Sequence, residues 1–328
     1  MNFTLAIPSL NYPTAADLPP LELPFLSKLM QFGKFKAAPA SASAFYAEYL
    51  WQGSLLARAK EAAGLPVEQA TVLVSPVWLQ MGMNQVNMLD GADIGIQADE
   101  AQRLCAELSD FYSDELCQFY PVRPDLWLAV MPNQPQWQTE PFWDVLGPND
   151  GSVRTENHAA DWLRMQTEIQ MWLHNHAINE SRSRAKVPPI NGVWLWNDLQ
   201  GKASESLPLG CESGWAQFYS GRRLDASYDW QTWLDALEES GLKGADSVVF
   251  LPDLAATGHT ADVWTYKDTL EQWDQRWFAP LWQALSEGRL KNLVIATDGE
   301  SGGELHIKAK AGRAFWKKSR VFAGSLGA

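Results

Sequence analysis

The chain has 328 residues, of which 46% are hydrophobic and 20% are charged. This apolar content excludes a disordered chain, and the length is enough for one large core or two smaller ones, since domains usually hold roughly 100–200 residues. The formal net charge of -13 repels phosphate backbones and anionic membrane surfaces. We therefore expect neither a nucleic acid nor a membrane as a partner.

The cysteines and the N-terminal residues indicate a cytoplasmic protein. Cys105, Cys117 and Cys211 are an odd number without a metal-type spacing, and free thiols fit a reducing compartment. The first residues carry no positively charged region and are interrupted by Pro8, unlike a signal peptide. No apolar run reaches the roughly 18 residues of a membrane span.

Tryptophan is unusually frequent, with 17 residues. An indole brings a large apolar area and one hydrogen-bond donor. The residues can form a Trp-rich core, which we favour, or an aromatic surface for protein partners.

The first part of the chain predicts a mixed α+β lobe at residues 1–135. Alternating apolar residues over Phe3–Ile7 predict a strand. The other expected elements are the helices Phe25–Phe35 and Ser43–Ala63, a helix that Asp99 caps and that runs through Leu104, Leu108 and Phe111, and the strands Thr71–Val74, Trp78–Met83, Val86–Leu89 and Leu126–Met131.

A polar segment rich in Pro, Gln and Asn predicts a linker at residues 136–156. An α/β lobe is expected at 157–328, unless the whole chain is one continuous domain. Its predicted helices and strands alternate, which favours helices packed on a mostly parallel sheet. They are a long helix over 158–186, then Gly192–Trp196, Trp230–Glu239, Ser247–Leu251, Trp264–Ser286, Leu293–Ala296 and the edge strand Glu304–Lys308.

The segment Trp162–Asp198 holds the most informative polar residues. At about 100° per residue, His176 and Glu180 lie on the apolar face of the predicted helix 158–186. Ionised groups are rarely buried unpaired. The two residues can form a buried hydrogen-bonded pair, line a ligand pocket, or supply two ligands of a metal.

The following strand ends at Asn197-Asp198, and ligands bind at such strand ends in parallel α/β sheets. Arg182 offers forked donors to a carboxylate or phosphate. The candidate ligand-binding residues are therefore His174, His176, Asn179, Glu180, Arg182, Asn191 and Asp198.

The same segment carries a family resemblance. It resembles bacterial regulatory proteins of the RpfE type, which are distantly similar to cofactor-independent phosphoglycerate mutases. The resemblance extends from about residue 71 to the C-terminus, and its most specific residues are Glu168, Gln170, His174, His176, Asn179, Arg182, Pro189, Asn191 and Trp194-Leu195-Trp196. This chain departs from the family at Asn197–Gly201, where a glycine-rich stretch is usual.

Residues 245–306 resemble, more weakly, the phosphoglycerate mutases and the wider alkaline phosphatase superfamily. That resemblance implies an alkaline-phosphatase-like or phosphoglycerate-mutase-like fold, with Asp253, His259 and Asp298 as remnants of ligands for two Mn or Zn ions. Asp253 and His259 are six residues apart rather than four, and Gly299 stands where a histidine is expected. No Asp-Ser or Asp-Thr nucleophile pair follows the first strand.

These observations favour a protein that is not an active phosphoglycerate mutase. We expect a binding or regulatory role towards an anionic small ligand or a partner protein, with no cofactor. The alternatives are a divergent metal-dependent phosphomutase or phosphatase and a Trp-rich interaction scaffold.

Overall fold

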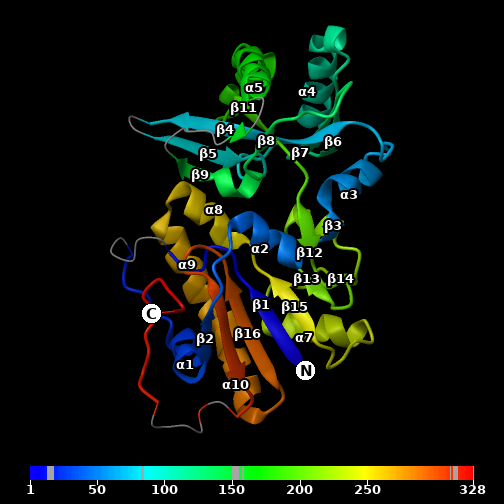
Figure 1. Cartoon of the computed structure of the whole chain (residues 1–328). Coiled ribbons are helices and arrows are strands. Elements are labelled where there is room, and N and C mark those ends of the chain that lie inside the picture. The colour runs from blue at the N-terminus through cyan, green and yellow to red at the C-terminus, as the bar shows by residue number, and fades with distance from the viewer. Residues whose placement is uncertain are drawn as a thin grey trace. The chain divides into compact units, whose positions relative to one another are not determined.

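The computed structural model describes residues 1–12, 18–82, 85–149, 155–156, 159–310, 312 and 317–327. The chain forms two compact units, one of Met1–Gln52 with Gly201–Ala328 and the other of Gly53–Gln200 (Figure 1). The predicted linker 136–156 lies inside the second unit instead of between two lobes. Its strand Gly147–Asn149 (β9) pairs with Val86–Asp90 (β5), so the polar composition belongs to connections within one unit.

The first unit is built on a mixed seven-stranded sheet. Its strands are β1 (Asn2–Ala6), β2 (Lys34–Ala37), β13 (Leu209–Gly210), β14 (Arg223–Leu224), β15 (Ser247–Phe250), β16 (Asn292–Thr297) and β17 (Gly303–Lys308). In the order β14-β13-β15-β1-β16-β17-β2, the first five strands are parallel, and β17 is antiparallel to both neighbours. The α/β class is confirmed, but the sheet is mixed, and β17 is an inner strand instead of the predicted edge.

Helices cover both faces of this sheet because its strands are apolar on both sides. They are α1 (Pro24–Phe32), α2 (Ala42–Tyr49), α7 (Trp230–Glu239), α8 (Asp253–Thr260), α9 (Val263–Trp273) and α10 (Ala279–Glu287), with the short 3-10 helix η4 (Gly214–Phe218). On one face, Tyr46 of α2 packs edge-on against Phe250 of β15, with ring centroids 5.0 Å apart. Val249, the residue before Phe250, points into the core on the opposite face.

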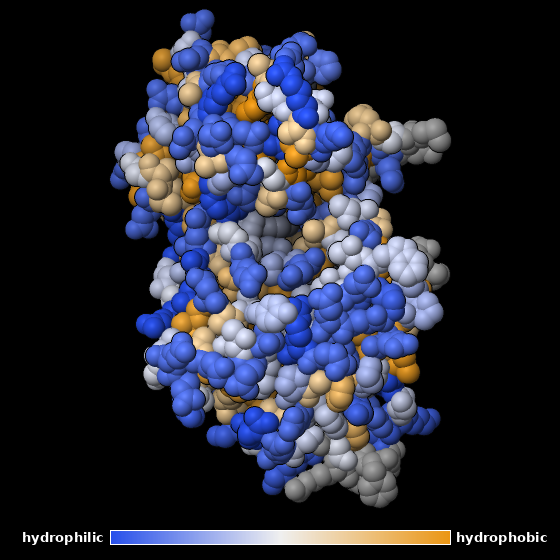
Figure 2. Space-filling model, turned by 180° about the vertical axis from the view of Figure 1, so that it is seen from behind, coloured by the Kyte–Doolittle hydropathy of each residue, from blue (hydrophilic) through white to orange (hydrophobic). Residues whose placement is uncertain are grey.

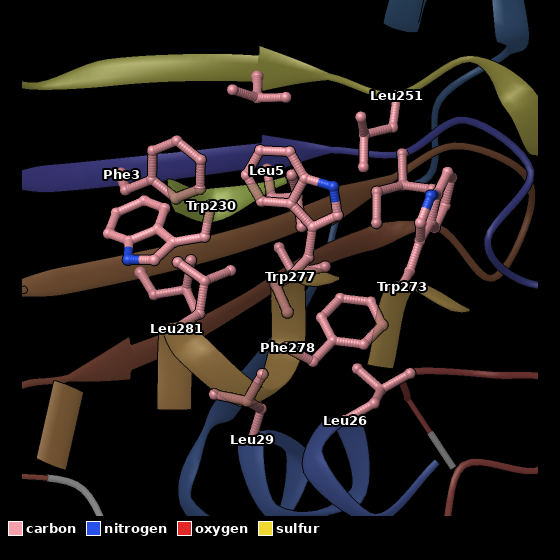
Figure 3. Close-up of a cluster of buried hydrophobic side chains, with 14 of the residues drawn as sticks. Phe3, Leu5, Leu26, Leu29, Trp230, Leu251, Trp273, Trp277, Phe278 and Leu281 are labelled. Atoms are coloured by element: carbon pink, nitrogen blue, oxygen red, sulfur yellow. The ribbon is translucent and has the colours of Figure 1, made fainter. Parts of the chain in front are cut away.

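Tryptophans fill the core on that opposite face (Figure 3). The Phe3 ring of β1 lies 4.9 Å from Trp230 and stacks at 6.2 Å on Trp277. Each fully buried large apolar side chain stabilises the fold by roughly 1.5–3 kcal/mol. Among the described residues, Trp264 is the tryptophan that belongs to the exposed large apolar side chains, and the face in Figure 2 is largely hydrophilic. The tryptophans of the described residues therefore serve mainly as core.

The predicted helix Trp264–Ser286 is interrupted by a π-helical turn, η5 (Asp274–Phe278), between α9 and α10. Asp274 is fully buried there, and its carboxylate accepts the N–H groups of Phe25 and Leu26 at 3.1 and 2.8 Å. These N–H groups lack a partner within the first turn of α1. The turn thus fixes α1 against η5. Such π-turns occur frequently at functional sites.

The second unit contains a six-stranded antiparallel sheet. Besides β5 and β9, its strands are β4 (Thr71–Met81), β6 (Gln118–Arg123), β7 (Leu126–Val130) and β11 (Gly192–Trp196), and β8 (Gln138–Thr139) pairs separately with β10 (Thr155–Glu156). β4 joins the two strands that were predicted at Thr71–Val74 and Trp78–Met83. Pro76, which lies between them, does not interrupt β4 and is paired with Val193 of β11. Met83, which we placed in the second of these strands, lies outside the described residues.

The helix predicted through Leu104, Leu108 and Phe111 is confirmed, with Gln97 instead of Asp99 as its N-cap, whereas the other predicted helices of this unit are divided. Four helices belong to the described part of the second unit. They are α3 (Leu55–Ala62), α4 (Ala98–Phe111), α5 (Ala159–His174) and α6 (Ala177–Arg184), with the 3-10 turns η2 (Ser113–Glu115) and η3 (Phe142–Val145). The predicted helix Ser43–Ala63 is divided by β3 (Gln52–Ser54), in which Gly53 has a φ of 74°. The chain passes between the units in β3 and in β12 (Gln200–Lys202).

The predicted helix 158–186 is also two helices, because His176 caps the start of α6. His176 and Glu180 are therefore not two positions on the apolar face of one long helix.

Among the helices of the described chain, none has both the length and the apolar character that crossing a bilayer requires.

Candidate functional site

His176 lies between α5 and α6 and is bonded on both ring nitrogens. Its Nδ1 accepts the N–H of Ile178 at 3.2 Å, and its Nε2 lies 2.7 Å from a carboxylate oxygen of Glu107 on α4. The ring also lies 4.5 Å from that of Trp172. The pKa of Glu107 is lowered by Arg103 and, to a smaller extent, by His176. The histidine is thus a buried cap that links two helices, which corresponds to the first of the three predicted alternatives but with Glu107 as its partner.

Asn179 and Asn191 hold backbone segments together. The side chain of Asn179 donates to the carbonyls of Leu173 and Ile190 at 2.9 and 2.8 Å and accepts the N–H of Ile190 at 2.8 Å. Asn191 both accepts from and donates to the backbone of Leu79, at 2.7 and 2.9 Å. Asn179 thus joins the end of α5 to the segment before β11, and Asn191 joins that segment to β4.

Arg182 is buried and its donors are distributed over three acceptors. Its Nε donates to the carbonyl of Pro188 at 2.6 Å, its Nη1 to Glu100 at 2.6 Å and its Nη2 to the carbonyl of Ile94 at 2.5 Å. A guanidinium with these partners is an internal cross-link and has little capacity left for a ligand.

The other three predicted residues lie at the surface. Glu180 forms an exposed ion pair with Arg184 at 3.3 Å, and His174 is the exposed last residue of α5. Asp198 accepts the N–H of Leu56 at 2.8 Å and the side-chain amide of Gln200 at 2.7 Å. Of the predicted set, His176, Asn179 and Arg182 therefore hold α6 to the residues around it, whereas the others lie at the surface or, as Asn191 does, bond elsewhere.

A different group of polar residues gathers in the first unit, where its parallel strands end. Four neighbouring parallel strands end there, in the order β13, β15, β1 and β16. Each is followed within three residues by one polar side chain, which is, in the same order, Glu212, Asp253, Ser9 and Asp298. The register pairs Ala6 with both Phe250 and Ala296, so these ends are level. In open α/β sheets this edge is where ligands bind.

Two of the predicted metal ligands lie on one helix and the third on a neighbouring loop. Asp253 begins α8, and His259 is in its last turn. The buried Asp298 accepts the N–H of Ser9 at 2.6 Å. Among the described residues, no three His, Cys, Asp or Glu side chains are grouped closely enough to hold a metal ion. Asp253, His259 and Asp298 thus do not assemble one metal centre in this structure.

Arg276 of η5 lies at the same edge of the sheet and lines a cavity of about 50 Å³ with Glu212, Ser227, Tyr228, Asp253 and Trp273. Its guanidinium carbon lies 4.4 Å from the centroid of the Tyr228 ring. Within the described part of the chain, Arg276 forms no hydrogen bond and no ion pair within 4 Å, and its buried Nε lacks a partner. This guanidinium is therefore available to an anion, unlike that of Arg182.

Asp253 is the acidic group of the cavity whose pKa is shifted. Burial raises the pKa of Asp253, the charge of Glu212 adds to the increase, and Arg276 opposes it. Glu212 accepts the hydroxyl of the buried Ser227 at 3.2 Å. The cavity thus combines one cation with two carboxyl groups, of which Asp253 takes up a proton more readily than usual.

Sequence reasoning missed Arg276 because it assigned Trp264–Ser286 to one regular helix. A period of 3.6 residues does not reveal a π-turn. One residue in the sequence could have indicated the irregular turn. Asp274 is a carboxylate next to Trp273 on the apolar face of the predicted helix, and a carboxylate that is buried there requires a partner.

No family profile matches the sequence, and no curated protein matches it. Two solved structures are similar over almost the whole chain. A cofactor-independent phosphoglycerate mutase from Thermoplasma acidophilum DSM 1728 is 13% identical, with a TM-score of 0.39 and coverage of 99% of this chain and 95% of that one. The PH0037 protein from Pyrococcus horikoshii is 14% identical, with a TM-score of 0.48 and coverage of 98% and 91%.

The first of these structures carries the name of the enzyme family to which the sequence resemblance points. At such identities and at TM-scores below 0.5, neither likeness supports a conclusion about the reaction. The RpfE-type resemblance stays a prediction.

Proposed function

We propose that the protein binds a small anionic ligand at the carboxyl edge of its mixed sheet and has a binding or regulatory role. The supporting observation is Arg276, whose guanidinium lies against Tyr228 and forms no hydrogen bond with the described residues. Arginine presents forked N–H donors that match a carboxylate or a phosphate. An aromatic ring against the guanidinium keeps its plane fixed, so little conformational freedom is lost on binding.

The size of the cavity limits which part of a ligand can enter. Small-molecule sites usually measure about 300–1,000 Å³, whereas this cavity measures about 50 Å³. Only a head group fits inside, and the rest of the ligand lies outside, beside the exposed Tyr228. We therefore expect a compact carboxylate or phosphate monoester rather than a large cofactor.

A thermal-shift screen of carboxylated and phosphorylated metabolites tests this proposal. A ligand at 100 times its Kd stabilises the native state by about 2.7 kcal/mol. Arg276→Gln is expected to abolish the shift because the amide lacks both the charge and the fork.

Arg289→Gln is the matched control for that screen. It removes an exposed guanidinium of the same unit, which pairs with Glu287, and it should retain the full shift. The proposal is wrong if no anion stabilises the protein, or if both variants respond to the same ligand equally.

Anion binding should strengthen as the pH is lowered from neutral towards the raised pKa of Asp253. The raised pKa of Asp253 means that its carboxyl group gains a proton at a higher pH than an ordinary aspartate, which removes a negative charge from the cavity. We expect an affinity gain of about 1 kcal/mol, or roughly fivefold, for a carboxylate ligand that does not itself titrate in this range. Calorimetric titrations of wild type and Asp253→Asn measure it. An unchanged pH dependence in Asp253→Asn would show that another group is responsible.

Divergent metal-dependent phosphoryl transfer is a second candidate, and Ser9 favours it. Ser9 follows the central strand β1, has a φ of 58° and donates its N–H to Asp298. Such a backbone conformation is uncommon for serine and is often stored at functional sites. A Cβ placed on Gly258 of α8 would lie 3.7 Å from the Ser9 hydroxyl, so α8 approaches this residue closely. Elemental analysis and an aryl-phosphate assay in Mn²⁺ or Zn²⁺, with Ser9→Ala as control, decide this candidate.

A further inference from the structure

The three charged residues of the Arg276 cavity do not pair with one another. Arg276, Glu212 and Asp253 line the same space of about 50 Å³. Within the described chain, however, no nitrogen of the Arg276 guanidinium lies within 4 Å of a carboxylate oxygen. The charges still act on one another: besides burial, which raises the pKa of Asp253, Glu212 raises it further and Arg276 lowers it. The cavity therefore holds both signs of charge without an internal ion pair.

The two signs of charge lie at different depths. The Nε of Arg276 is buried, and so are the side chains of Leu251 and Trp273, which line the cavity with it (Figure 3). Glu212 and Asp253 are exposed residues, which places their carboxyl groups where the cavity opens. A ligand that enters therefore meets the guanidinium and apolar side chains inside and carboxyl groups at the opening.

The carboxylate of Glu212 has acceptor sites left for a ligand. Among the described residues it accepts one hydrogen bond, from the hydroxyl of the buried Ser227 at 3.2 Å, and this bond fixes its position. A carboxylate has about four lone-pair sites, and an ammonium group has three donors. An anion that carries no ammonium group would instead place its charge beside like charges, which is unfavourable. Glu212 thus favours a ligand that brings a cation of its own.

We infer that the ligand of this cavity is an α-amino acid, with its carboxylate on Arg276 and its ammonium group on Glu212. This inference rests on the proposed function, because the carboxylate is the anionic group that Arg276 would bind. Both charged groups of an α-amino acid are attached to one carbon atom, so a compact head group reaches both residues. The side chain of the amino acid then lies outside the cavity, beside the exposed Tyr228 ring.

Calorimetric titration with three matched probes tests this inference at pH 7. L-alanine carries both charges, propionate lacks the ammonium group, and ethylammonium lacks the carboxylate. L-alanine is expected to bind roughly fivefold more tightly than propionate, the scale of a partly exposed ion pair, and ethylammonium should not bind measurably. Glu212→Gln should weaken the binding of L-alanine and strengthen that of propionate, since it removes the partner of the ammonium group and a like charge near the carboxylate. Its amide oxygen can still accept the Ser227 hydroxyl.

Glu239→Gln is the matched control. It removes an exposed carboxylate of α7 that does not line the cavity, and it should leave all affinities unchanged. The inference is overturned if propionate or ethylammonium binds as tightly as L-alanine, or if Glu212→Gln weakens L-alanine and propionate equally.

Failure of the proposed function itself would look different. Then neither L-alanine, propionate nor inorganic phosphate binds, or Arg276→Gln binds them as wild type does. If inorganic phosphate binds through Arg276 and L-alanine does not, the amino-acid inference fails and the proposed function stands.

Discussion

Replacement of Arg182 by alanine is expected to lower the free energy of unfolding by about 3–5 kcal/mol. The substitution leaves Glu100 without its buried cation and leaves the carbonyls of Ile94 and Pro188 without donors. Groups stranded in this way lose their bonds with water as well as with the protein. Urea unfolding followed by circular dichroism measures the effect.

Arg184 provides the control two residues further along α6. It is exposed, and among the described residues its one ion pair is with Glu180, at 3.3 Å, so Arg184→Ala should change the free energy of unfolding by less than about 1 kcal/mol. A double variant with Glu100→Gln should recover part of the loss caused by Arg182→Ala, since the unpaired charge is then absent. Equal losses in Arg182→Ala and Arg184→Ala would contradict the structural role of Arg182.

Replacement of Asp274 by alanine is expected to destabilise the protein by about 3 kcal/mol, because two charge-assisted hydrogen bonds to the start of α1 are lost. Burial raises the pKa of Asp274, and the hydrogen bonds from Leu26 and Phe25 oppose this increase. Asp274→Asn removes the charge but keeps one acceptor, so it should cost about half as much as alanine. Thermal unfolding measures both changes.

Asp268→Ala is the control for Asp274, since Asp268 is exposed on the neighbouring helix α9. It should unfold like wild type. If Asp274→Asn is as damaging as Asp274→Ala, the negative charge, and not the hydrogen-bonding oxygen, holds α1 in place.

The strands were the part of the fold that the sequence predicted best. Runs such as Val193–Trp196 and Leu293–Ala296 are apolar throughout, and the structure places them in β11 and β16. Apolar runs this short, bounded by turn residues and rich in β-branched or aromatic side chains, are typical of buried strands. The strand over Phe3–Ile7 was also predicted, although its neighbours β15 and β16 come from distant parts of the chain.

The helix interruptions could not be read from periodicity. His176 is not among the residues that usually cap a helix, and it does so because Glu107 holds the other side of its ring. The π-turn at Asp274 depends on the first turn of α1, which lies about 250 positions earlier in the chain. In both cases the cause is a tertiary contact that no local pattern contains.

The site prediction failed for a related reason. Polar residues that crowd one sequence segment were expected to face a ligand together. Instead Arg182 and Asn191 find partners 82 and 112 residues away, at Glu100 and Leu79. Arg276 has no hydrogen-bond partner among the described residues and lies in a stretch that reads as an ordinary Trp-rich helix. The hydrogen bonds in the folded chain, and not the sequence pattern, distinguish an arginine that cross-links the fold from one that can bind a ligand.

The first unit is assembled from both ends of the chain, and this has a consequence for biosynthesis. The central strand β1 pairs with β15 and β16, which the ribosome makes about 240–290 residues later. The second unit is one continuous segment, Gly53–Gln200, so it can complete its sheet while the rest is still being translated. At about 5–20 residues per second, Met1–Gln52 therefore waits many seconds with its apolar strand unpaired. During this interval the apolar strand lacks the neighbours that cover it in the folded unit.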